Sequence, residues 1–144
     1  MSDTIISKLI KARSEIQPPK KEGTNPHFRS KYVTLEGVIE AVTEPLAKQG
    51  FFLAQEVNDY PDGRPTVSTI LRHESDEAWR MTSSVPLVLS KQDMQGLGSA
   101  ITYARRYGIM SLLNLPAEDD DGNGASGTPT NAAPAPKTER KNAW

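Results

Sequence analysis

The sequence contains no cysteine, which excludes disulfide bonds, a thiolate nucleophile and any cysteine-ligated zinc or iron–sulfur site. It also lacks an apolar run approaching the roughly 18 residues that a membrane-spanning helix needs. The first residues, MSDTIISKL, have neither the basic region nor the long apolar core of a signal peptide. These absences together favour a soluble protein of the cytoplasm.

Signatures of catalysis are missing as well. The two histidines, His27 and His73, lie far apart without the spacing of a metal site, so we expect structural or surface roles for them. Gly96-Leu97-Gly98 lacks the third glycine of a dinucleotide fingerprint, and there is no P-loop, GxSxG or HExxH motif. We therefore expect no enzyme, with no catalytic residue, no metal and no cofactor.

Composition changes sharply after residue 116. Residues 117–144 are rich in Pro, Ala, Gly, Ser, Thr and Asn and hold five acidic and three basic residues, so we predict a disordered acidic tail. Residues 1–116 hold fourteen basic and thirteen acidic residues and are expected to form one domain. The run Glu118–Asp121 is interpreted as a solvated linker, although an acidic tail can also occupy a basic DNA groove.

The pattern of apolar residues in the domain predicts helix, helix, three strands and helix. Short polar turns separate the strands, so they should form an antiparallel meander, because parallel strands need longer crossovers. The predicted fold is therefore α+β, a three-stranded meander packed by helices on one face, a β-β-β-α core preceded by two helices. The expected elements are a helix over 3–16 capped by Ser2 or Asp3, a helix from the cap Thr34 to the stop Gly50, strands over 51–57, 65–73 and 78–88, and a helix over 92–115.

The last predicted helix has two parts. In its first part a polar stripe runs at helical spacing through Gln95, Ser99, Thr102 and Arg106, with Arg105 beside the apolar stripe. Beyond Arg106 the residues become apolar all round, from Ile109 to Leu115. A helix that is apolar on every side should be buried on every side, and in so small a domain we expect a neighbouring subunit to supply part of the cover.

Two groups of residues are suited to nucleic acid. On the last helix, hydroxyl, amide and guanidinium groups can donate to phosphate oxygens, and Tyr103 and Tyr107 could stack on bases, with burial in a core or interface as the alternative. Earlier in the chain, basic residues lie among aromatics, with a solvated loop as the alternative. The second group comprises Lys20, Lys21, Arg29, Lys31 and Tyr32.

The blocks NPHFRSKYVTLEGVIEAVTEPLAKQG and GLGSAITYARRYGIMSLLNLPAEDDDGN resemble the two signature blocks of the ERF family. These are the essential-recombination-function single-strand annealing proteins of bacteriophages and prophages. The resemblance implies a β-β-β-α core like that of Rad-type annealing proteins, and annealing of complementary strands during phage homologous recombination without nucleotide hydrolysis. It places Arg105 and Arg106 among the groove-lining residues, and leaves open whether Arg29 to Tyr32 contact DNA or a neighbouring subunit.

The resemblance also implies partners. These are single-stranded DNA, further copies of the chain in a ring or filament and, beyond them, a phage exonuclease and a host single-strand-binding protein, in the cytoplasm of a bacterial host. The tail is shorter than in many relatives, which puts functions that depend on the tail in doubt. A sequence-specific regulator that binds duplex DNA is the alternative, although no helix-turn-helix spacing is found.

Overall fold

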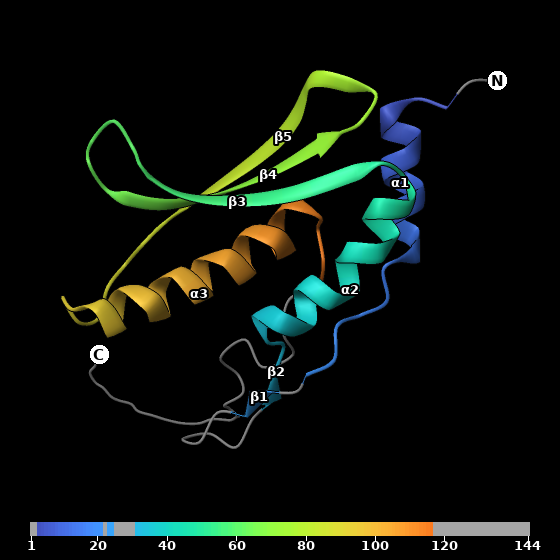
Figure 1. Ribbon diagram of the computed structural model, residues 1–144. Helices are drawn as coiled ribbons and strands as arrows, with labels where there is room; N and C mark the ends of the chain where they lie inside the picture. Colours follow the sequence, from blue (N-terminus) through green and yellow to red (C-terminus); the bar gives the residue numbers. More distant parts are fainter. Residues whose placement is uncertain (1–2, 22, 25–30, 117–144) are drawn as a thin grey trace.

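We describe the protein from a computed structural model in which residues 3–21, 23–24 and 31–116 are described (Figure 1). The predicted tail, residues 117–144, lies outside this part of the chain. The described elements are, in chain order, α1 (Ile5–Glu15), β1 (Gly23–Thr24), β2 (Lys31–Tyr32), α2 (Leu35–Lys48), β3 (Phe51–Asp59), β4 (Pro65–His73), β5 (Asp76–Pro86) and α3 (Met94–Leu112).

The predicted antiparallel meander is confirmed. Strands β3, β4 and β5 form one sheet in that order, and the central row pairs Leu53 with Leu71 and Leu71 with Met81. Strand β5 begins and ends two residues earlier than predicted, because the chain turns tightly after β4 and brings His73 opposite Asp76. Strands β1 and β2 make a separate two-stranded antiparallel ribbon.

The helices cover one face of the sheet, as predicted (Figure 1). Helix α3 packs against β4 and β5, α2 packs against β3 and α3, and α1 packs against α2. The main core fills the space between them. Its buried residues come from all three helices and from the sheet: Leu9, Ala12, Ile16, Val33, Val38, Val42, Leu46, Phe51, Leu71, Ile109, Met110, Leu113 and Leu115.

The apolar residues Ile109, Met110, Leu113 and Leu115 at the end of α3 are buried within the single chain, whereas Ser111 and Asn114 are exposed, so the predicted neighbouring subunit is not what covers the apolar residues. Ile109 is 1% exposed and Leu113 4% exposed within the single chain, in a core shared with α1 and α2. Arg13 of α1 closes this end, since its Nε donates to the carbonyl of Leu113 at 2.7 Å and an amino group donates to the carbonyl of Asn114 at 2.7 Å. The prediction was wrong because the sequence does not show that α1 returns to this end of α3.

Side chains define where the helices begin. Thr34 accepts the backbone N–H of Gly37 at 3.0 Å and caps α2, as predicted. Thr4, rather than Ser2 or Asp3, caps α1 through a reciprocal pair of hydrogen bonds with Ser7. After α2 the chain turns into β3 at Gly50, whose φ of 86° lies in the left-handed region that favours glycine.

The position of α3 on the sheet depends on a close approach at Gly108. A Cβ atom at this glycine would lie 2.3 Å from Oγ1 of Thr69 in β4, so a larger residue fits only if Thr69 or the helix shifts. The amide of Gln55 lies beside this contact and donates to Oγ1 of Thr69 and to the carbonyl of Arg105, both at 2.9 Å. The same amide accepts from Nε of Arg105 at 2.9 Å, so one side chain of β3 joins the helix to two strands.

We predict that Gly108→Ala lowers the free energy of unfolding by about 1–3 kcal/mol, because the added methyl group overpacks the interface. Alanine would otherwise favour the helix by about 1 kcal/mol over glycine. Gly98→Ala, in the same helix with open space around it, is the matched control and should stabilise the protein. Urea unfolding of both variants measures the difference, and a Gly108→Ala variant as stable as Gly98→Ala would contradict the close approach.

Candidate nucleic-acid interface

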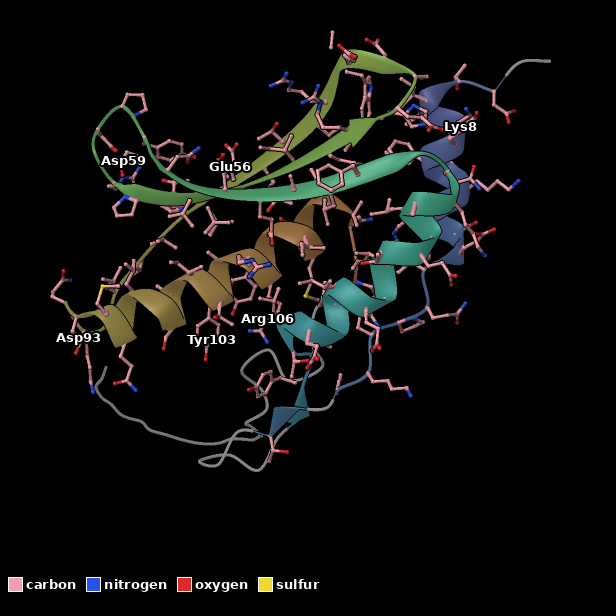
Figure 2. The ribbon with its side chains drawn as sticks, in the orientation of Figure 1. Lys8, Glu56, Asp59, Asp93, Tyr103 and Arg106 are labelled. Carbon is pink, nitrogen blue, oxygen red and sulfur yellow. The ribbon has the colours of Figure 1, made fainter. Side chains whose placement is uncertain are left out.

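Arg106 lies at the centre of the residues that the sequence singled out. Its side chain is only 4% exposed, and one amino group donates to the carbonyl of Val33 at 2.6 Å. Arg106 and Tyr103 project from the side of α3 that faces away from the sheet, toward the segment that contains β2 (Figure 2). The polar stripe was expected to be exposed up to Arg106, and this is wrong for Arg106, because aromatic rings cover its guanidinium.

These rings belong to three tyrosines. The Cζ atom of Arg106 lies 5.3 Å from the ring centroid of Tyr32, 5.3 Å from that of Tyr103 and 5.1 Å from that of Tyr107. At such distances a guanidinium is attracted by the negative faces of the rings. The favourable contacts with the rings and with the Val33 carbonyl offset the cost of removing the charge from water.

The tyrosines keep part of their surface in solvent. Tyr103 is 56% exposed and Tyr107 50% exposed, and their rings stack with centroids 6.2 Å apart and an angle of 28° between the planes. Tyr32 is 36% exposed and is paired with Gly23 across the β1–β2 ribbon, where a Cβ atom would lie 2.4 Å from the tyrosine ring. We call Tyr32, Tyr103 and Tyr107 the tyrosine platform.

A cavity of about 250 Å³ adjoins the platform, and we call it the tyrosine pocket. It brings together four of the predicted site residues that precede Arg106 in the chain: Tyr32, Ser99, Thr102 and Tyr103. Gln95 is exposed one turn earlier on α3 and is not among the lining residues. The complete lining is Tyr32, Thr34, Leu35, Ser99, Thr102, Tyr103 and Arg106.

Arg105 points in another direction. Its Nε donates to Gln55 of β3, and its side chain lines a second cavity between α2, β3 and α3. Neighbouring residues of a helix lie about 100° apart around its axis, so Arg105 and Arg106 occupy different sides of α3. The sequence resemblance placed both in one groove, and the structure separates them.

The basic segment before α2 is described only in part. Lys20 is exposed, and its backbone passes the first turn of α2, where its carbonyl oxygen would lie 3.6 Å from a Cβ atom at Gly37. Lys21 is partly buried. Arg29 and the side chain of Lys31 lie outside the described residues. The segment thus reaches the end of α2 that lines the tyrosine pocket.

Sequence reasoning missed three contributors to this site. Gly23 supports the ring of Tyr32, Val33 supplies the carbonyl that holds Arg106, and Leu35 lines the pocket. Each depends on contacts between distant parts of the chain, and local spacing carries no signal for such contacts.

We predict that Arg106→Gln lowers the free energy of unfolding by about 2–3 kcal/mol, because it removes a charged hydrogen bond to a buried carbonyl. Arg64→Gln is the matched control, since Arg64 also lies over a tyrosine ring, at 5.5 Å from that of Tyr60, but on an exposed turn. Replacing Arg64 should lower the free energy of unfolding by less than about 1 kcal/mol. Equal stability of the two variants in urea unfolding would show that Arg106 has no such structural role.

Of the comparisons with known proteins, one identifies the family of this chain. No helix in the described part of the chain is long and apolar enough to cross a membrane. Neither a search of curated proteins nor one of solved structures gave a match. A family model described as the ERF superfamily matches residues 5–143, which include both sequence blocks and every residue of the tyrosine platform. The chain therefore belongs to the ERF superfamily of phage-type recombination proteins.

Proposed function

We propose that the protein binds single-stranded DNA on the tyrosine platform and anneals complementary strands during phage homologous recombination, without hydrolysing nucleotides. The observation that carries this proposal is the half-exposed pair Tyr103 and Tyr107 above a buried guanidinium. Family membership supports the recombination role.

The platform is suited to bases because it is aromatic and already ordered. Stacking on an aromatic side chain is worth about 1–3 kcal/mol per base and tolerates any sequence, since every base has a flat face. Contact with Arg106 holds the tyrosine rings in place, so binding costs little further side-chain entropy. A protein that anneals arbitrary complementary strands needs this kind of recognition, in which sequence is read by base pairing alone.

The spacing of the two rings favours a stretched strand. Their centroids are 6.2 Å apart, which exceeds the rise of about 3.4 Å per nucleotide in a duplex strand. Bases held one on each ring would therefore be separated from each other. Separated bases are available for pairing with a second strand, which then supplies most of the favourable free energy of annealing.

Phosphate contacts come from the edges of the platform in this proposal. Ser99 and Gln95 offer hydroxyl and amide donors along α3, whereas the Thr102 hydroxyl donates to the carbonyl of Gly98 at 3.1 Å and would have to exchange that bond for a phosphate. Lys20, Lys21, Arg29 and Lys31 supply positive charge from the segment that carries Tyr32. Arg105, on another side of α3, does not share the tyrosine pocket, so we assign it no phosphate contact there.

One chain offers few phosphate contacts, and this is why we propose a multimer, as a ring or a filament. Linking several weak sites along one strand raises the overall affinity without new contacts in each site. Binding should also weaken steeply with salt, in proportion to the phosphates that are neutralised. A phage exonuclease and a host single-strand-binding protein remain proposed partners.

We predict that the double variant Tyr103→Leu, Tyr107→Leu binds a labelled single-stranded oligonucleotide at least tenfold more weakly, because two stacking contacts of about 1–3 kcal/mol each are lost. The double variant Tyr103→Phe, Tyr107→Phe keeps the rings and should bind like the original protein. Tyr60→Leu, at the β3–β4 turn, controls for the loss of a tyrosine elsewhere. Fluorescence anisotropy at two salt concentrations gives the affinities, and thermal melting confirms that each variant folds.

The same proteins are then tested for annealing of complementary oligonucleotides without nucleotide. The leucine variant should lose annealing and the phenylalanine variant should keep it. Unchanged affinity in the folded leucine variant would overturn the platform assignment. Tighter binding to duplex than to single strands would instead favour the sequence-specific regulator.

A further inference from the structure

The cavity beside Arg105 is a second site that the DNA-binding proposal leaves unused. Its volume is about 310 Å³, and it shares no lining residue with the tyrosine pocket. Most of its wall is apolar and comes from α2 and the start of β3, and its polar lining residues are Thr43, Gln55 and Arg105. The apolar residues include Ile39, Val42, Leu46, Phe51 and Leu53. We call it the Arg105 pocket.

Arg105 is fixed by one hydrogen bond, and its terminal amino groups remain as donors for a ligand. Its Nε donates to Gln55, which fixes the side chain at the pocket wall. Within the described part of the chain, its two terminal amino groups make no hydrogen bond to protein. A guanidinium presents such groups in a planar fork that suits a carboxylate. The pocket therefore fits an apolar side chain that lies next to an acidic one.

The chain itself displays this combination at the start of α3. Met94 is 80% exposed, so its apolar side chain is available for contact with another surface. Asp93 precedes it and is exposed, and its Oδ1 atom accepts the backbone N–H of Gly96 at 2.7 Å as the cap of the helix. The second carboxylate oxygen remains available. Val88, 85% exposed, extends the apolar surface at this end of the molecule.

Met94 cannot enter the pocket of its own chain. Met94 and Arg105 belong to the same helix and are eleven residues apart, which corresponds to about 17 Å along the helix axis. Figure 2 shows Asp93 at the end of α3 remote from Arg106. The start of α3 is thus a projection that fits a pocket of the same protein but can reach it only on another copy.

We propose that Met94 of one copy inserts into the Arg105 pocket of the next, and that the Asp93 carboxylate pairs with Arg105 there. The contact joins two different surfaces, so it repeats from copy to copy and builds a ring or a filament. This inference rests on the proposed function, which requires a multimer, and it adds the surfaces that form it. The tyrosine pocket stays open, because none of its lining residues takes part.

Two variants test the contact on the full chain. Met94→Lys removes the apolar projection and sets a positive charge against Arg105, whereas Arg105→Glu sets a negative charge against Asp93. Light scattering after size-exclusion chromatography should give a multimer for the original protein and a monomer for each variant. An equimolar mixture of the variants should associate again, because the intact projection of Arg105→Glu fits the intact pocket of Met94→Lys.

Two further variants distinguish this contact from a general effect of changed surface charge. Ile10→Lys makes the same kind of change at an apolar residue that is 65% exposed on α1 and should keep the original mass. Asp93→Asn keeps a good helix cap but removes the charge, and should weaken assembly several-fold without unfolding the protein. Arg105→Glu removes the hydrogen bond to Gln55, so it could lower the melting temperature. Asp93→Asn then tests the contact in a folded protein.

The proposal is overturned if the original protein is a monomer, if Met94→Lys keeps the original mass, or if the mixture of variants stays monomeric. Dissociation by Ile10→Lys alone would place the contact on α1 instead. Binding of an oligonucleotide short enough to span one copy distinguishes failure of the Met94–Arg105 contact from failure of the proposed function. Its affinity should be the same for the original protein and for Met94→Lys, and should fall only in the tyrosine variants.

Discussion

The close packing of Gly108 against Thr69 is the constraint on which the rest of the structure depends. Only a residue without a side chain lets α3 approach β4 so nearly. The amide of Gln55 on β3 stabilises the contact by donating to Thr69 of β4 and to the backbone of α3. This fixes both the position of the helix and its rotation about its own axis. Every other side chain of α3 then faces a neighbour determined by its place on the helix.

Two adjacent arginines show the effect of this rotation. Arg105 is directed toward β3 and α2, where Gln55 holds it at the wall of an apolar pocket. Arg106 is directed away from the sheet and lies under three tyrosine rings. The first remains able to pair with a carboxylate, whereas the second is a support for aromatic groups. Their chemistry is the same, and burial and partners make them different.

Much of the fold could be predicted because its signals are local. The cap at Thr34, the stop at Gly50 and the bounds of β4 follow from residues within a few positions, and short polar turns between strands imply the antiparallel meander. The α+β arrangement with helices on one face follows from the alternation of apolar residues. These features need no knowledge of distant contacts.

The site was harder to predict because it is built from distant segments. Helical spacing alone places Ser99 and Thr102 in the polar stripe of α3 with Tyr103 beside it, and these three residues line the tyrosine pocket. The burial of Arg106 depends on Tyr32 and Val33, more than seventy residues earlier, and helical spacing cannot show that a distant segment covers a polar residue. The packing of α1 against the end of α3 could not be predicted for the same reason.

The turn of α3 from Arg105 to Gly108 also limits how the sequence of this chain can change. Four consecutive residues meet four different surroundings: the Gln55 amide, the Val33 carbonyl, solvent and the ring of Tyr103, and Thr69 of the sheet. Inserting or deleting one residue would turn the part of the helix that follows by about 100° relative to the part before it, so the two parts could no longer fit their surroundings together. Substitutions can be absorbed here one at a time, but the length of this stretch must be kept.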